Sequence, residues 1–152
     1  MTTKTLDSPF GPVSFAVEDG LLFRVRFQVD TNSTENDDPL AEEVASQLEA
    51  YFTGRLFNFD LPLAPPHSEF QAGIRQCMID IPFGEMRTYG ELAKDLGSAS
   101  QAVGQACGAN PIPIIVPCHR VVAAGGKLGG FSGGDGAPTK RKLLNHEAVY
   151  AP

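Results

Sequence analysis

The stretch NPIPIIVPCHRVV, residues 110–122, decides how the second half of the chain folds. Three prolines interrupt it, at positions 111, 113 and 117. Because proline has a fixed φ and no amide hydrogen, this spacing excludes a regular helix and favours extended chain. The isoleucines and the valine between the prolines are apolar enough to be buried. We therefore expect a stiff, buried segment that delivers Cys118, His119 and Arg120 together.

Cys118 is the candidate nucleophile of this segment. A cysteine is inert as a thiol and nucleophilic as a thiolate, so it needs a base or a positive field nearby. Adjacent side chains of an extended chain point to opposite sides, so His119 acts through a water unless a kink brings it closer. The alternative is a small buried hydrophobe at Cys118 beside a surface or hydrogen-bonded histidine. The residues alone leave both interpretations open.

The glycine-rich segment that follows, GGKLGGFSGGDG (125–136), predicts a loop. It does not match a phosphate-binding loop, because Lys127 is followed by Leu128 and the earlier glycine is missing. Metal binding is not expected either, since Cys118 and His119 are too close in sequence to chelate one ion well. No cofactor is implied.

The first part of the chain predicts strands followed by one helix. Strands are expected at 13–18 and 21–27, on either side of the turn signal Asp19-Gly20. Residues 28–38 are polar and predict a loop. Asp38 and Pro39 suit the N-cap and first position of a helix that ends before Gly54. Its inward positions are Leu40, Val44, Leu48, Tyr51 and Phe52. Residues 57–61 are expected to return to the sheet.

The proline-rich stretch LPLAPPHS, 61–68, marks a boundary between domains 1–64 and 65–152. Ser68 can cap a helix whose apolar side carries Phe70, Ile74, Cys77, Met78 and Ile81. After a turn at 81–85, Thr88 and Glu91 form a capping-box pattern that opens a short helix ended by Gly97. A second short helix is expected at about 99–108. Two short helices joined by a glycine-containing turn predict a helix-turn-helix.

Charge and cysteine content restrict the partner and the compartment. The formal charge is −6, but residues 1–67 carry −7 and residues 68–152 carry +1, so any nucleic-acid contact belongs to the second half. Three scattered cysteines do not predict a disulfide framework, which favours a reducing cytoplasm. No apolar run is long enough for a membrane span, and the start lacks the features of a signal peptide. We expect a cytoplasmic monomer.

Several segments together resemble the O6-alkylguanine-DNA alkyltransferases. They are QLEAYFTGRLFNFDLPL (47–63), IPFGEMRTYGELA (81–93), AVGQA (102–106), PCHRV (117–121), GGFSGG (129–134) and K-x-x-LL-x-x-E (140–147). The resemblance spans nearly the whole chain. It implies an α+β fold, with a small antiparallel sheet and helix that are ribonuclease-H-like, and a mostly helical half with a winged helix-turn-helix. It also implies DNA repair by stoichiometric transfer of an alkyl group from O6-alkylguanine in double-stranded DNA to Cys118.

The resemblance assigns roles to individual residues. Cys118 would attack the alkyl carbon, His119 would accept the thiol proton through a water, and Glu147 would orient His119. Asn110 would brace the turn that presents the cysteine. Tyr89 would press on the phosphate beside the flipped nucleotide and protonate the departing guanine at N3.

The remaining roles concern the base and the DNA. The Ser132 amide would meet O6, the Cys118 and Val121 carbonyls would accept from the exocyclic amine, and Lys140 would steady the Ser132 loop. The residues expected around the base are Val121, Ser132, Gly133, Lys140 and Cys107. Those expected against the DNA are Gln101, Tyr89, Arg120 and Ala102.

Gln101 departs from the family, which usually has an arginine here that enters the minor groove and fills the space of the flipped base. Either Gln101 inserts beside the orphaned cytosine, or it is an exposed helix residue and Tyr89 does the flipping. The departure leaves a second function open, a sensor that binds alkylated DNA with weak or no transfer. An unrelated Cys-His hydrolase is a third hypothesis.

Overall fold

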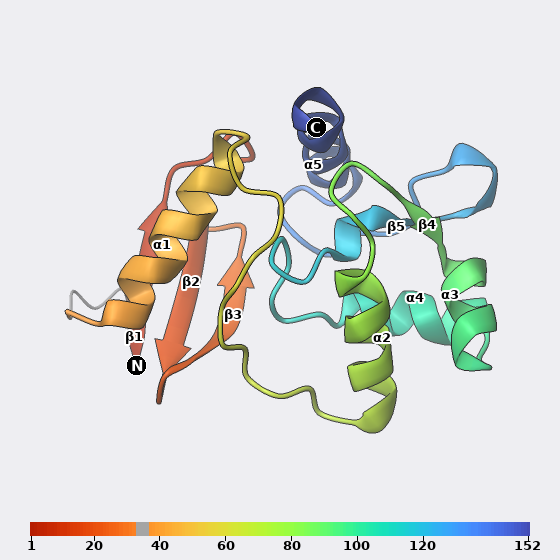
Figure 1. Cartoon of the computed structure of the whole chain (residues 1–152), viewed down its shortest axis with the longest axis horizontal. Coiled ribbons are helices and arrows are strands. Elements are labelled where there is room, and N and C mark those ends of the chain that lie inside the picture. Colours follow the sequence, from red (N-terminus) through yellow and green to blue (C-terminus); the bar gives the residue numbers. More distant parts are fainter. Residues whose placement is uncertain (33–36) are drawn as a thin grey trace.

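The computed structural model describes residues 1–32 and 37–152, and it confirms the α+β class (Figure 1). The strands are β1 (Thr2–Leu6), β2 (Val13–Glu18), β3 (Leu21–Arg26), β4 (Arg87–Thr88) and β5 (Val121–Val122). The helices are α1 (Pro39–Phe52), α2 (Glu69–Ile79), α3 (Tyr89–Leu96), α4 (Ser100–Gly108) and α5 (Ala137–Tyr150). Two 3₁₀ turns, η1 (Cys118–Arg120) and η2 (Ala124–Gly126), lie between α4 and α5. None of the helices described is both long and apolar enough to cross a membrane.

The N-terminal half is an antiparallel sheet in the order β1-β2-β3 with α1 packed on one face (Figure 1). The predicted hairpin is confirmed, and its turn residues Asp19 and Gly20 have φ of 53° and 75°. Positive φ at both positions matches the right-handed twist of the flanking strands. The predicted start of α1 is confirmed as well, since the Asp38 carboxylate accepts from the Leu40 amide at 2.9 Å and Pro39 follows.

Two expectations for these regions need correction, and a third holds where it can be checked. Residues 57–61 form no strand; the chain instead touches β3 through a single bridge between Leu22 and Leu63. In the predicted loop 28–38, residues 28–32 and 37–38 are indeed outside helix and strand, and 33–36 lie outside the described residues. Phe70, in the first turn of α2, is exposed rather than packed inward.

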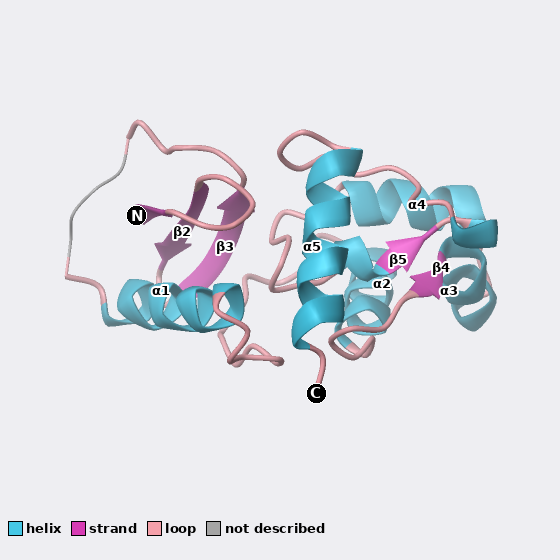
Figure 2. Cartoon of the chain, turned by 90° about the horizontal axis from the view of Figure 1, so that it is seen from above, coloured by secondary structure: helices cyan, strands magenta, loops and turns pink. Residues whose placement is uncertain are grey.

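The C-terminal half contains the expected helix-turn-helix in α3 and α4. The capping box is confirmed: the Thr88 hydroxyl accepts from the Glu91 amide at 3.1 Å, and the Glu91 carboxylate accepts from the Thr88 amide at 2.9 Å. Gly97 ends α3 in the left-handed conformation. Seen from above, α5 lies between the sheet and the α3–α4 pair (Figure 2).

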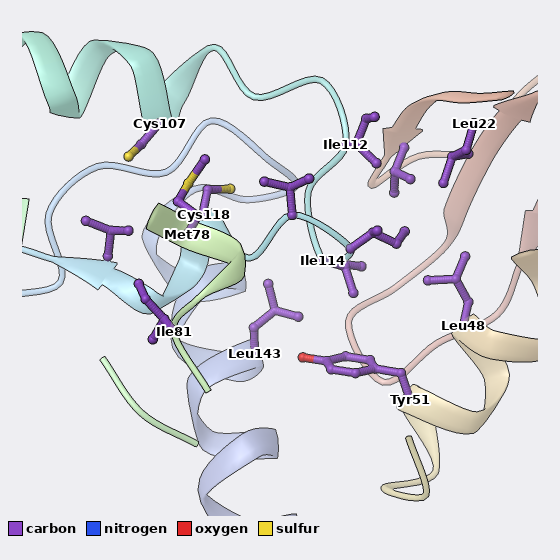
Figure 3. Close-up of a cluster of buried hydrophobic side chains, with 14 of the residues drawn as sticks. Leu22, Leu48, Tyr51, Met78, Ile81, Cys107, Ile112, Ile114, Cys118 and Leu143 are labelled. Atoms are coloured by element: carbon purple, nitrogen blue, oxygen red, sulfur yellow. The ribbon is translucent and has the colours of Figure 1, made fainter. Parts of the chain in front are cut away.

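The segment 110–117 sits where the two halves meet, and its apolar side chains join one continuous core (Figure 3). Ile112 and Ile114 are fully buried, near Leu22 and Leu48 of the N-terminal half. Each such side chain contributes about 1.5–3 kcal/mol on burial. Ile114 has a φ of 73°, which is strained for a β-branched residue. The active-site segment is therefore held in an unfavourable backbone conformation by packing against both halves.

Candidate active site

Cys118 is presented by a tight turn and not by extended chain, which corrects the sequence prediction. Pro117 has φ −81° and ψ 68°, an inverse γ-turn in which the Cys118 amide donates to the Val116 carbonyl at 2.8 Å. Cys118 then begins η1. The Asn110 side-chain Nδ2 donates to the Val116 carbonyl at 2.8 Å, and its side-chain oxygen accepts from the Ile112 backbone amide at 3.1 Å. Asn110 is therefore placed to brace this turn.

The Cys118 side chain is buried, but it lines an open cavity of about 450 Å³. Asn110 and Ser132 line the same cavity. Burial raises the pKa of the Cys118 thiol, whereas the Asn110 hydrogen bond and the positive charge of Lys140 oppose that rise. The thiol is thus largely protonated at rest and needs a base to become a nucleophile.

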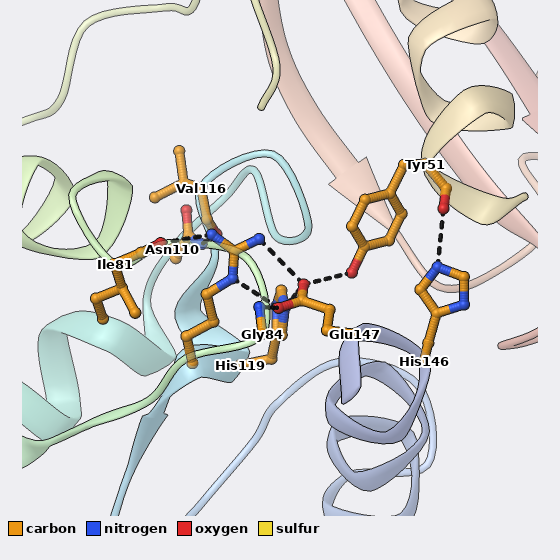
Figure 4. Close-up of polar contacts among 9 residues, drawn as sticks. Tyr51, Ile81, Gly84, Asn110, Val116, His119, His146 and Glu147 are labelled. Atoms are coloured by element: carbon orange, nitrogen blue, oxygen red, sulfur yellow. Dashed lines mark hydrogen bonds and ion pairs between the residues drawn. The ribbon is translucent and has the colours of Figure 1, made fainter. Parts of the chain in front are cut away.

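His119 supplies a base of defined tautomer. Its ring is completely buried, and its Nε2 lies 2.6 Å from Glu147 Oε2 (Figure 4). Burial lowers the pKa of His119, so the ring is neutral near pH 7. Because a carboxylate only accepts, Nε2 must carry the proton and Nδ1 must hold the free lone pair. His119 Nδ1 has no protein hydrogen-bond partner among the residues described.

Glu147 is the centre of the polar network. Its carboxylate also accepts from the Gly84 amide at 3.1 Å and from the Arg120 Nε at 2.8 Å. Burial alone would raise the pKa of Glu147, but the hydrogen bonds and charges of His119 and Arg120 outweigh it and hold the pKa far below its usual range. Glu147 therefore stays a carboxylate throughout the physiological range.

Arg120 was expected to contact DNA, and its burial contradicts this. Only 5% of the residue is exposed, and its Nη1 donates to the Ile81 carbonyl at 2.7 Å. Its Nε and Nη2 donate to the two oxygens of Glu147 in a bidentate ion pair. All three guanidinium nitrogens already donate within the protein. Arg120 is a buried counterion for Glu147.

Lys140 is the second buried cation, and its ammonium uses all three donors. It donates to the Val121 carbonyl at 2.6 Å, to the Tyr89 hydroxyl at 3.2 Å and to the Gly130 carbonyl at 3.2 Å. Lys140 thus ties α3, β5 and the glycine loop to α5. The Val121 carbonyl, expected to read the guanine amine, is already an acceptor for Lys140, so only its second lone pair is available for a base.

The other expected residues lie around two openings. Tyr89, Gln101 and Ser132 line an open groove of about 600 Å³ beside the helix-turn-helix. The Ser132 hydroxyl donates to the Gly108 carbonyl at 3.0 Å. Gly133 lines the Cys118 cavity, where a Cβ would come within 2.6 Å of the Phe27 ring.

Two of these residues on α4 differ sharply in their surroundings. Ala102 is half-buried near the N-terminus of the helix, next to the exposed Gln101. Cys107 is buried near the other end, and burial raises its pKa to about 12. Such a thiol stays protonated at neutral pH. Because burial raises the pKa of both thiols, position separates them: Cys118 lines the open cavity, whereas Cys107 lines neither opening.

One residue of the network lay outside the sequence prediction of the site. Tyr51, on α1 of the N-terminal half, donates its hydroxyl to Glu147 Oε2 at 2.7 Å (Figure 4). The sequence placed Tyr51 only on the apolar face of its helix. The available signal was the hydroxyl itself, because a buried tyrosine hydroxyl normally has a polar partner.

Comparison with known proteins identifies the family of the chain. Two family models match the chain: the ribonuclease-like domain of 6-O-methylguanine DNA methyltransferase over residues 1–65, and the DNA binding domain of the same family over residues 69–149. A methylated-DNA–protein-cysteine methyltransferase of Methanosarcina acetivorans is 46% identical over 136 residues, which cover 84% of this chain and 87% of that protein. The Mycobacterium tuberculosis protein of the same name is 43% identical over 156 residues, covering 98% and 93%.

Solved structures support the same family. The Mycobacterium tuberculosis OGT in complex with DNA has a TM-score of 0.86 at 42% identity, covering 100% of this chain and 96% of that one. The O6-methylguanine methyltransferase of the same organism has a TM-score of 0.84 at 40% identity, covering 99% and 94%. This chain belongs to the 6-O-methylguanine DNA methyltransferase family.

Proposed function

We propose that this protein repairs DNA by moving an alkyl group from O6 of guanine onto Cys118, once per molecule. The observation that carries the proposal is a cysteine at an open cavity, directly followed in sequence by a buried histidine held at 2.6 Å by a buried carboxylate. In the transfer, the sulfur–carbon bond forms as the carbon–O6 bond breaks, and the guanine leaves with O6 and takes up a proton. The thioether has no leaving step, so the protein is consumed.

The resting thiol loses its proton to His119 Nδ1, the one ring nitrogen with a free lone pair, through a bridging water. Glu147 stabilises the imidazolium that results. Cys118 then attacks as a thiolate. The Ser132 amide supports the developing charge on O6, and Tyr89 supplies the proton at N3. The Tyr89 hydroxyl suits this role, because Lys140 donates to it at 3.2 Å and makes it a better donor.

Double-stranded DNA is the partner, and it approaches the groove beside α3 and α4. A target base inside the stack is out of reach of a buried thiol, so it must rotate out of the duplex. Tyr89 and Gln101 line that groove, which supports a role for them at the flipped nucleotide and at the gap it leaves. The division into domains 1–64 and 65–152 assigns DNA contact to the second.

We propose that the reaction takes place in the cytoplasm and that the protein acts as a monomer. All three cysteines, Cys77, Cys107 and Cys118, are free thiols. A nucleophilic thiolate must stay reduced until it meets its substrate, which a reducing compartment ensures.

The proposal is tested with an excess of duplex DNA carrying a labelled O6-methyl group. We expect one label per protein molecule and no further turnover. Binding to the DNA without covalent label would mean a damage sensor, and more than one label released per protein would mean a turnover enzyme. Either result contradicts stoichiometric transfer.

A separate prediction concerns Gln101. Gln101→Arg should tighten duplex binding and steepen the dependence of log K on log salt by about one unit, because it adds one phosphate contact. Gln101→Ala should slow repair of duplex DNA and hardly affect the free alkylated base, which needs no flipping. The measurements are salt titrations of binding and transfer rates on both substrates.

The matched control for the added charge is Gln76→Arg, on an exposed position of α2 away from the groove. If Gln101→Arg and Gln76→Arg change the salt slope equally, Gln101 does not face DNA. Equal slowing of both substrates by Gln101→Ala would show that it does not hold the stack open.

A further inference from the structure

Tyr51 connects the N-terminal half directly to the proposed proton relay. Its ring is completely buried, and its hydroxyl reaches Glu147 Oε2, the same oxygen that accepts from His119 Nε2. The two residues are 96 positions apart in the chain, and Figure 4 shows them meeting from α1 and α5. We propose that Tyr51 is a positioning residue of the alkyl-transfer site, which acts on Cys118 through Glu147 and His119. This inference rests on the proton relay of the proposed function.

A second contact fixes where α5 lies against α1. The Tyr51 carbonyl accepts from His146 Nε2 at 2.8 Å, and the rings of Tyr51 and His146 pack with centroids 5.1 Å apart. Tyr51 therefore holds two consecutive residues of α5. Its backbone carbonyl binds His146, and its side-chain hydroxyl binds Glu147. The position of the relay carboxylate depends on the N-terminal half through this residue.

The shared oxygen also makes Tyr51 a chemical influence on the relay. Each donor on Glu147 Oε2 withdraws part of its negative charge. Without the Tyr51 hydroxyl, Oε2 becomes a stronger acceptor for the His119 Nε2 proton, and His119 Nδ1 becomes more basic. The imidazole then takes the thiol proton of Cys118 at lower pH. The Tyr51 hydroxyl thus moderates the activation of the thiol.

The rest of the network should survive the loss of this hydroxyl. Arg120 still grips both carboxylate oxygens, and the Gly84 amide still donates to Oε1. Burial and the charge of Glu147 raise the pKa of Tyr51, so its hydroxyl keeps its proton and remains a donor. Among the residues described, the titratable and charged groups coupled to the thiol, the imidazole or the carboxylate are His119, Arg120, Lys140, Glu147, Cys107, Tyr51 and Tyr89.

The test is the pH midpoint for alkylation of Cys118 by iodoacetamide in the full chain, read by mass on the peptide that contains Cys118. Tyr51→Phe should lower the midpoint by about half a unit, roughly a threefold gain in thiolate below it. A fluorotyrosine placed at Tyr51 is a stronger donor and should raise the midpoint. The affinity for alkylated duplex DNA should not change. Tyr150→Phe, which removes a hydroxyl from a partly exposed tyrosine of α5, is the matched control and should leave the midpoint in place.

The outcomes separate this inference from the proposed function. An unmoved or raised midpoint in Tyr51→Phe, with a raised midpoint in Glu147→Gln, overturns the role of Tyr51 and leaves the relay intact. An unmoved midpoint in both variants overturns the relay as well. If Tyr51→Phe unfolds the protein, the fluorotyrosine variant keeps the packing, and a midpoint equal to the wild type then overturns the inference.

Discussion

Glu147→Gln is expected to slow alkyl transfer at saturating DNA by about a hundredfold or more, the usual contribution of a positioned base. The carboxylate accepts from His119 Nε2 and so keeps the lone pair on Nδ1. An amide in its place presents its NH₂ or a weaker acceptor, and it adds no negative charge to stabilise the imidazolium. The proton of Cys118 then has no effective acceptor. The measurement is the first-order rate constant in a single-turnover experiment.

The affinity for alkylated DNA should change little in this variant, because Glu147 is buried away from the groove. Glu85→Gln, in the exposed turn before α3, is the matched control and should transfer at the wild-type rate. A wild-type rate in Glu147→Gln would remove Glu147 from the mechanism.

Arg120→Met is expected to lower the free energy of unfolding by about 3–5 kcal/mol, because it leaves the Glu147 carboxylate buried without its counterion. For a chain of this size, the melting temperature should fall by roughly 6–20 °C. Thermal or denaturant unfolding measures the loss. Arg141→Met, at an exposed position of α5, is the matched control and should change stability by less than about 0.5 kcal/mol.

A double variant shows whether the loss comes from the unpaired charge. Arg120→Met combined with Glu147→Gln should cost clearly less than the two single changes added together, because neither charge is then left alone. The salt dependence of DNA binding should be the same in Arg120→Met and the wild type. A loss of unfolding free energy below about 1 kcal/mol, or a shallower salt dependence of DNA binding, would mean that Arg120 contacts DNA after all.

Local rules in the sequence were sufficient for the elements whose ends carry their own signals. The Asp38 and Thr88 caps and the Asp19-Gly20 turn need only neighbouring residues, and each lies where it was expected. Strand β1 has no such signal, because Thr2–Leu6 alternates weakly and carries few apolar residues. The predicted strand at 57–61 was wrong for the opposite reason: the apolar residues that suggest a strand are present, but they pack against the core without pairing.

The active-site turn depends on packing that sequence patterns do not contain. Prolines restrict φ but do not specify the inverse γ-turn at Pro117 or the positive φ of Ile114. The contact between Arg120 and Glu147 could not be predicted either, because the two residues are 27 positions apart and only the fold brings them together. The contact of Tyr51 with Glu147 joins the two halves and exists only in the folded chain.

Transfer to Cys118 is tested by locating the methyl group after reaction with O6-methylguanine DNA. The protein is digested and each cysteine-containing peptide is weighed. We expect one methyl group per molecule, on the peptide that contains Cys118, with Cys77 and Cys107 unmodified. A methyl group on Cys77 or Cys107, or none on any cysteine, would contradict it.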